Sequence, residues 1–229
     1  MAIHPMPELL SQEIIVRASK LNAAQLADGM KGLGIPNDGC MDAGIMPVDI
    51  EMHVVGTAMT VETKDGDNFP IHVATYSGKP GYVMVIDGKG YTGKAYFGDL
   101  IMGAASAVGF AGMICDGYVR DRKGCIELGM PVYARGFMQR GPGKKDPGEI
   151  NLPVTCGGIT VHPGDLIVGD YDGVTVVPRD RILEVLEKAE EKADYEKKRD
   201  AAIEAYKTAL AAGKELPQLA PQWVLDMIK

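Results

Sequence analysis

Apolar and polar residues alternate between strand-like and helix-like patterns from residue 53 to residue 136. Residues 53–63 (HVVGTAMTVET) are rich in β-branched side chains and alternate in polarity, which predicts a strand. Residues 81–88 (GYVMVIDG) form a continuous apolar run closed by Asp-Gly, typical of a buried strand. Further strands are predicted at residues 109–117 and 131–136, and helices at 68–77, at 100–108 and shortly before residue 131. This order predicts parallel βαβ units.

The flanking segments have different patterns. Residues 7–34 predict one amphipathic helix, with Pro7 and Glu8 in its first turn and Gly32 and Gly34 ending it. Residues 141–149 are a loop of Gly, Pro and Lys. Residues 153–178 contain short β-branched runs separated by Gly-Gly, Pro-Gly-Asp and Asp-Gly. Those dipeptides and tripeptides are turn signals, so this segment predicts a meander of antiparallel strands.

The chain from Arg179 to about Gly213 predicts one long helix. Before Gly213 this stretch has no Gly or Pro, and it is rich in charged residues. Its first part has an apolar face to bury, made of Ile182, Leu183, Val185 and Leu186. Residues 190–200 (EEKADYEKKRD) have no such face. They are either a solvated stretch of helix or a stretch that reaches a neighbouring subunit.

No internal repeat or low-complexity linker divides these segments. We therefore expect a single α/β domain over residues 1–229, with a core at about 20–180 and a C-terminal helix at about 179–213. Its sheet should be mixed, because parallel βαβ units are followed by a β-rich second half.

Composition and charge exclude several classes of protein. The 229 residues are 46% hydrophobic and 24% charged, as in ordinary globular proteins. The net charge of −7 argues against a nucleic-acid partner, which needs a basic surface. The N-terminus has no secretory signal pattern, and no stretch approaches the length of a membrane span. We expect a cytoplasmic protein with reduced, mostly buried cysteines.

Residues 88–95 (GKGYTGKA) nearly match the phosphate-binding loop of nucleotide hydrolases. The match fails at Ala95, where that loop needs a Ser or Thr hydroxyl to hold magnesium. We interpret the segment as a Gly-rich connection between a strand and a helix.

A stronger candidate site lies between Gly98 and Asp121. Asp99 stands where a loop becomes a helix, and free backbone N–H groups at such a place bind carboxylate or phosphate. Arg120 and Asp121 follow the end of a strand, where open α/β sheets bind ligands. Taken separately, Asp99 can be a plain N-cap and Arg120–Asp121 a surface salt bridge. A strand, its helix and the next strand would bring the two places together.

The run of Asp99, twenty residues and then Arg120-Asp121 resembles the signature of the class II pyruvate aldolases that cleave 4-hydroxy-4-methyl-2-oxoglutarate and 4-carboxy-4-hydroxy-2-oxoadipate. The segments GFAGMICDGYVRD, GMPVYARG, VVGTAMTV and NLPVTCGGITVHPGDLIVGDYDGVTVVP are also similar to that family and to its relative, the regulator of ribonuclease activity A. The resemblance covers roughly residues 20–210. It implies a mixed sheet of the swivelling β/β/α type. Asp99 favours the aldolase branch, because the ribonuclease regulators lack this acid.

The resemblance implies a site for a divalent cation, Mg²⁺ or Mn²⁺, and a 2-oxo acid. Asp121 would be a metal ligand, and Asp99 a catalytic acid that contacts the metal through water. Arg120 would donate to the keto oxygen and stabilise the enolate. Gly98, Leu100 and Ile101 would complete the substrate site, with the N–H groups of Leu100 and Ile101 holding the carboxylate.

The resemblance also implies a homotrimer or homohexamer in which a neighbouring subunit's C-terminal helix supplies a further acid. Glu196 is the closest local match, and Glu191 and Glu204 remain alternatives. Arg122 and Lys123 could meet a distal carboxylate of the substrate or form a solvated basic turn. The expected reaction is metal-dependent cleavage that releases pyruvate, with oxaloacetate decarboxylation beside it. The alternatives are a non-enzymatic regulator that binds a ribonuclease and an aldolase or decarboxylase for another 2-oxo acid.

Overall fold

The computed structural model describes residues 1–228, and the chain divides into two compact units. The main unit is Met1–Ala189 and the C-terminal unit is Glu190–Lys229. Every strand belongs to the main unit. Whether the chain counts as one domain therefore stays a prediction.

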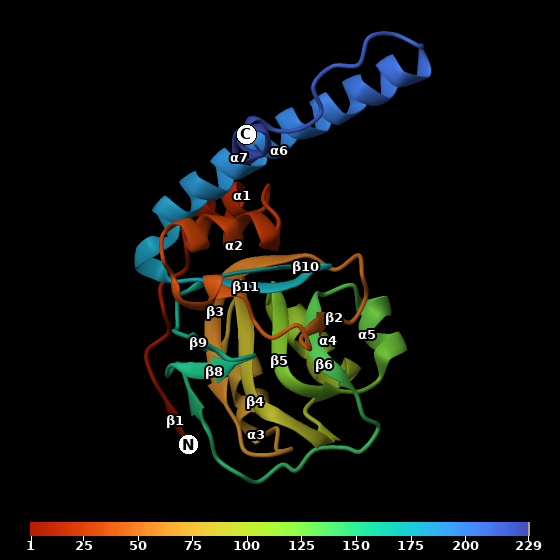
Figure 1. Cartoon of the computed structure of the whole chain (residues 1–229). Coiled ribbons are helices and arrows are strands. Elements are labelled where there is room, and N and C mark those ends of the chain that lie inside the picture. Colours follow the sequence, from red (N-terminus) through yellow and green to blue (C-terminus); the bar gives the residue numbers. More distant parts are fainter. Residues whose placement is uncertain (229) are drawn as a thin grey trace. The chain divides into compact units, whose positions relative to one another are not determined.

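Four parallel strands form the centre of a nine-stranded sheet (Figure 1). They are β3 (Val54–Glu62), β4 (Tyr82–Ala95), β5 (Gly112–Val119) and β6 (Val132–Phe137), adjacent in that order. Each connection carries a helix: α3 (Phe69–Ser77), α4 (Asp99–Val108) and α5 (Arg122–Leu128). The predicted βαβ units are confirmed.

Shorter strands make the sheet mixed. β10 (Leu166–Asp170) pairs antiparallel with β3 and with β11 (Gly173–Val177). β7 (Glu149–Ile150) extends the β3 side and pairs with β1 (Ala2–Ile3), whereas β2 (Met46–Pro47) pairs with β6. β8 (Val154–Cys156) and β9 (Ile159–Val161) form a separate antiparallel pair. The expected meander is therefore two separate hairpins, because β9 does not pair with β10.

Alternating side chains of the central strands feed two apolar cores. Met84 and Ile86 of β4 face the core that includes side chains of α3, α4 and α5. Val83 and Val85 face the opposite core, which the β8–β9 and β10–β11 hairpins cover (Figure 1). Helices thus cover one face of the sheet, and side chains of the β8–β9 hairpin and of strands β10 and β11 pack on the other. The α/β fold class with a mixed sheet is confirmed.

The N-terminal segment forms two helices where one was predicted. These are α1 (Gln12–Ala18) and α2 (Ala23–Gly32), followed by the short helix η1 (Pro36–Gly39). The break occurs because the Asn22 side chain accepts from the N–H of Gln25 while the Gln25 side chain accepts from the N–H of Asn22. This reciprocal capping starts a new helix. The helix also begins at Gln12 and not at Pro7, because Ser11 is its cap.

The predicted long helix is confirmed as η2 (Arg179–Arg181) continuing into α6 (Ile182–Ala211), and α7 (Gln222–Met227) follows. Ile182, Val185 and Leu186 are buried, but Leu183 is 62% exposed and does not belong to the apolar face. Within residues 1–228, no helix combines the length and apolar character that a membrane crossing requires. All four cysteines are free, and three of them are buried, as expected.

Candidate active site

The sequence-predicted residues of the main unit meet at one edge of the sheet. Because β3, β4 and β5 are parallel neighbours, the segments that leave their carboxyl ends lie side by side. These segments lead into α3, α4 and α5, and they carry Asn68, Asp99 and the Arg120–Asp121 pair respectively. The fold therefore places the site where open α/β sheets bind ligands.

Asp99 is the first residue of α4, and Gly98 is its N-cap. The plain N-cap interpretation of Asp99 is therefore wrong. A side chain at Gly124 would place its Cβ 2.6 Å from Asp99 Oδ2, so the carboxylate lies against the first turn of α5. The N–H of Met102 donates to Gly98 O at 3.1 Å, which closes the first turn of α4. The N–H groups of this turn that precede Met102, including those of Leu100 and Ile101, have no partner inside the helix.

The Arg120–Asp121 pair lies against the start of α4. Arg120 N donates to Phe97 O at 2.9 Å, which joins the two loops. Asp121 has the left-handed backbone (φ 57°) and its carboxylate does not cap α5. Arg120 Nε lies 3.3 Å from Asp121 Oδ2 without hydrogen-bond geometry. A Cβ at Gly98 would lie 2.2 Å from Asp121 Oδ2, so the close approach requires glycine there.

Gly98, Arg120 and Asp121 line a cavity of about 90 Å³, whereas Asp99 is not among its lining residues. Asn68 and His72 of the α3 region form one wall, and Pro142 and Lys144 belong to the loop after β6. Burial, followed by the charge of Lys144, lowers the pKa of His72. The full lining is Asn68, His72, Phe97, Gly98, Leu100, Ile101, Arg120, Asp121, Pro142 and Lys144.

Asp99 and Asp121 share one electrostatic environment. Burial, and then the negative charges of Asp99 and Asp121, raise the pKa of the Cys125 thiol to about 11. The Cys125 thiol is therefore protonated at neutral pH. Two carboxylates suit Mg²⁺ or Mn²⁺, which prefer oxygen ligands, and Mg²⁺ retains several waters. No cluster of three His, Cys, Asp or Glu side chains suited to a metal occurs in residues 1–228. Asp99 and Asp121 would supply two of the oxygen ligands of such a cation, and water the others.

The loop at residues 141–146, here called the strap, is fastened to the α3 region by Asp67. Asp67 is 3% exposed, and its carboxylate accepts from the N–H groups of Lys145 and Phe69, both at 2.9 Å. Gly143 N donates to Gly66 O at 2.7 Å, and Asn68 N donates to Gly143 O at 3.0 Å. These bonds hold Pro142 and Lys144 at the cavity.

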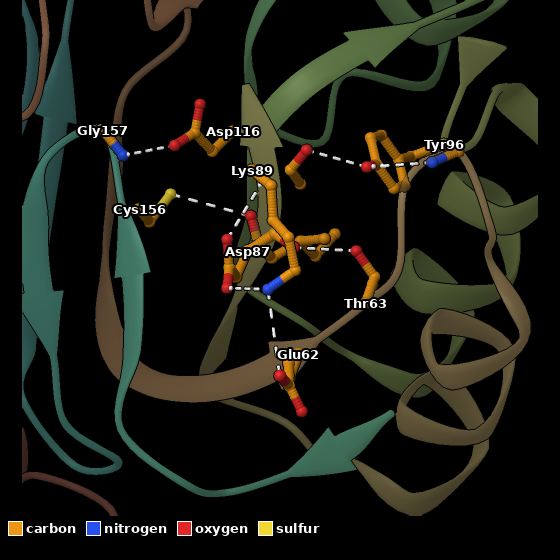
Figure 2. A network of polar contacts seen from close by, with 11 residues as sticks. Glu62, Thr63, Asp87, Lys89, Tyr96, Asp116, Cys156 and Gly157 are labelled. Carbon is orange, nitrogen blue, oxygen red and sulfur yellow. Dashed lines mark hydrogen bonds and ion pairs between the residues drawn. The ribbon is translucent and has the colours of Figure 1, made fainter. Parts of the chain in front are cut away.

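The near-match to a phosphate-binding loop is part of strand β4, which continues to Ala95. The interpretation as a strand-to-helix connection is therefore wrong. Lys89 Nζ donates to Asp87 Oδ2 at 2.9 Å and lies 3.8 Å from Glu62, as Figure 2 shows. Tyr96 donates to Gly88 O at 2.8 Å. The lysine of the phosphate-binding pattern is Lys94 and not Lys89, but the extended strand leaves no loop that could surround a phosphate.

Comparisons with known proteins show the family of this chain. The profile of the family described as RraA-like, Aldolase/RraA, matches residues 23–176. The chain belongs to the RraA-like family. A protein of Halalkalibacterium halodurans named "Putative 4-hydroxy-4-methyl-2-oxoglutarate aldolase" is 42% identical over 159 residues, 69% of this chain and 76% of that protein.

Two crystal structures resemble this RraA-like protein over most of its length. An uncharacterized protein from Pseudomonas syringae pv. tomato has a TM-score of 0.78 at 28% identity, covering 88% of this chain and 93% of the other. Streptomyces coelicolor RraAS2, described as an unusual member of the RNase ES inhibitor RraA protein family, has a TM-score of 0.73 at 25% identity, covering 82% and 96%. The family resemblance found in the sequence is confirmed.

Other predicted residues of the RraA-like protein lie elsewhere. Glu196 belongs to α6 in the C-terminal unit, where Lys192 Nζ lies 3.9 Å from its carboxylate. Its role stays a prediction, as do those of Glu191 and Glu204. Arg122 does not line the cavity: it stacks on Phe137 at 4.8 Å and donates to Val48 O. Lys123 is exposed and pairs with Glu127 at 3.7 Å, as expected of a solvated basic turn.

Sequence reasoning missed Asn68, His72 and Lys144. The first two lie in a segment that was interpreted only as a helix, and Lys144 in one interpreted only as a loop. The available signal was topological: residues that follow the carboxyl end of a predicted parallel strand belong to the ligand-binding edge.

Proposed function

We propose that this RraA-like protein is a divalent-metal-dependent lyase that cleaves a 4-hydroxy-2-oxo di- or tricarboxylate by a retro-aldol reaction and releases pyruvate. Substrates of the 4-hydroxy-4-methyl-2-oxoglutarate or 4-carboxy-4-hydroxy-2-oxoadipate type fit the proposal. Its main support is that Asp99 lies against α5 beside Arg120 and Asp121. The name of the Halalkalibacterium halodurans relative supports the same class of reaction.

The substrate would bind through its 2-oxo acid end. The free N–H groups of Leu100 and Ile101, aided by the helix dipole, would hold the carboxylate. The Arg120 guanidinium would donate to the keto oxygen. When the bond between C3 and C4 breaks, its electron pair moves into an enolate whose negative oxygen Arg120 stabilises. The C4 hydroxyl loses its proton toward Asp99, C4 becomes a carbonyl, and protonation of C3 yields pyruvate.

Mg²⁺ or Mn²⁺ would be held by Asp121, with Asp99 reaching it through water. When bound, the cation supplies Lewis-acid stabilisation of the developing negative charge. Oxaloacetate decarboxylation should accompany cleavage, because loss of carbon dioxide from oxaloacetate gives the same pyruvate enolate. An aldolase or decarboxylase for another 2-oxo acid uses the same residues, and differs only in the group beyond C3.

The decisive experiment measures pyruvate release from a panel of 4-hydroxy-2-oxo acids with and without metal. Chelator should abolish release, and Mg²⁺ or Mn²⁺ should restore it. Full activity in excess chelator would contradict the proposal. Trapping of substrate on the protein by borohydride would also contradict it, because that result requires a Schiff-base lysine.

A further inference from the structure

Asn68 stands at the N-cap of α3 without capping it. Asn is among the best N-cap residues, because its side chain normally accepts from a backbone N–H of the first turn. Here Asp67 Oδ1 accepts from Phe69 N at 2.9 Å, and the Asn68 side chain makes no capping bond. The backbone of Asn68 is fixed on both sides: its N–H donates to Gly143 O and its carbonyl accepts from His72 N at 3.1 Å. The position of the side chain is thus fixed, although the side chain makes no hydrogen bond to the helix.

The carboxamide oxygen of Asn68 is buried and has no hydrogen-bond partner among residues 1–228. Asn68 is 2% exposed and lines the cavity together with Arg120 and Leu100. A buried acceptor left unpaired costs free energy, and folded proteins satisfy nearly all such groups. An unpaired acceptor on a side chain that lines a ligand cavity points to a hydrogen-bond donor on the ligand.

The proposed substrate class offers one such donor. At neutral pH its carboxylates are ionised and accept hydrogen bonds only, as does the keto oxygen. The C4 hydroxyl is the only donor on the molecule. We infer that Asn68 Oδ1 accepts a hydrogen bond from the C4 hydroxyl of the bound substrate and so selects 4-hydroxy-2-oxo acids, an inference that rests on the proposed function.

Asn68 acts in this proposal on the substrate as it binds. The hydroxyl turns about its bond to C4, so the same proton can point to Asn68 in the bound substrate and leave toward Asp99 during cleavage. Loss of Asn68 should therefore raise KM more than it lowers kcat. Oxaloacetate in its keto form has no C4 hydroxyl, so its decarboxylation does not use this bond.

The test compares two reactions in the same protein. Asn68→Ala and wild type are assayed with Mg²⁺ for cleavage of 4-hydroxy-4-methyl-2-oxoglutarate and for decarboxylation of oxaloacetate. We expect the ratio of the two kcat/KM values to fall about tenfold or more, mainly through KM for the hydroxy acid. We also expect the thermal midpoint of Asn68→Ala to stay the same or rise, because the variant removes an unpaired buried polar group. A residue with only a structural role would give a lower midpoint and an unchanged ratio.

Asn151 provides a matched control. It is also a buried Asn with an unpaired Oδ1, but it does not line the cavity, and its Nδ2 donates to His4 O. Its backbone is left-handed (φ 62°), so Asn151→Gly is the suitable variant. It should lower the thermal midpoint and leave the ratio of activities unchanged.

The outcomes separate this inference from the proposed function. An unchanged ratio in folded Asn68→Ala, or an equal loss of both reactions, overturns the role of Asn68 while the aldolase proposal stands. Wild type that releases no pyruvate from either substrate overturns both. If Asn68→Ala does not fold, Asn68→Ser serves, because Ser is a good N-cap with a shorter reach and should lower the ratio in the same way.

Discussion

At the scale of single residues, Arg120 is placed for the proposed chemistry. Its backbone is fixed by the bond to Phe97 O, and its Nε makes no aligned hydrogen bond to Asp121. If it stabilises the enolate, Arg120→Ala should reduce pyruvate release by about 10²-fold or more, as loss of an oxyanion donor does. Arg120→Lys should retain little of the wild-type activity, because a lysine ammonium lacks the planar pair of N–H donors of a guanidinium. Steady-state kinetics of both variants check this, and near-normal turnover in Arg120→Ala would contradict it.

Asp99→Asn distinguishes a catalytic acid from a structural one. Because Gly98 is the N-cap, the Asp99 carboxylate has no capping bond to lose. We expect an unchanged thermal midpoint together with loss of pyruvate release, measured on the same preparation. Normal release from Asp99→Asn would show that Asp99 is not the catalytic acid.

At the scale of elements, the strap depends on Asp67. Burial by itself would raise the pKa of Asp67, but the N–H groups of Lys145, Phe69 and Asp146 lower it below its usual value. A carboxylate with a lowered folded-state pKa stabilises the fold above its unfolded-state pKa of about 4. That contribution is lost as the pH falls through the lower folded-state value. The charge of Asp67 therefore stabilises the strap at neutral pH and not in strong acid.

Asp67→Asn should consequently cost about 1–3 kcal/mol of unfolding free energy at pH 7. The difference from wild type should shrink as the pH falls below about 4, because wild type then loses the same charge. Urea unfolding at pH 7, 5 and 3 measures it. A difference independent of pH would show that the charge of Asp67 does not hold the strap.

At the scale of the whole molecule, the site is expected to be completed by another subunit. Leu100 lines the cavity and is 83% exposed, and the charged part of α6 has few buried side chains. The protein should run as a trimer or hexamer in light scattering, and Glu196→Ala should lower turnover with the assembly intact. A monomer that retains activity would refute the shared site. A loss seen only in Glu191→Ala or Glu204→Ala would correct the register of the helix.

The strands and helices that carry the candidate site were predictable from the sequence, and so was the proximity of Asp99 to Arg120 and Asp121. Apolar runs and β-branched strands are local signals, and twenty residues are enough for one helix and one returning strand. The signature also sufficed for the family. The sequence did not reveal the break at Asn22, where the side chains of Asn22 and Gln25 each accept from the other residue's N–H. It also did not reveal that β4 continues through glycines to Ala95. Pairing of β4 with its neighbour β5 overrides local preference there.

The residues that surround the signature became known only from the folded chain. Asn68 and Lys144 are 76 residues apart in the sequence. The Asp67 carboxylate joins their segments by accepting from Lys145 N, but in the sequence Asp67 looks like any other aspartate in a turn. Which side chain caps α3, and which is left unpaired at the cavity, depends on hydrogen bonds between distant loops. Such bonds produce no repeating pattern in the sequence. Each needs only one backbone donor and one acceptor, and the fold brings the two together from distant segments.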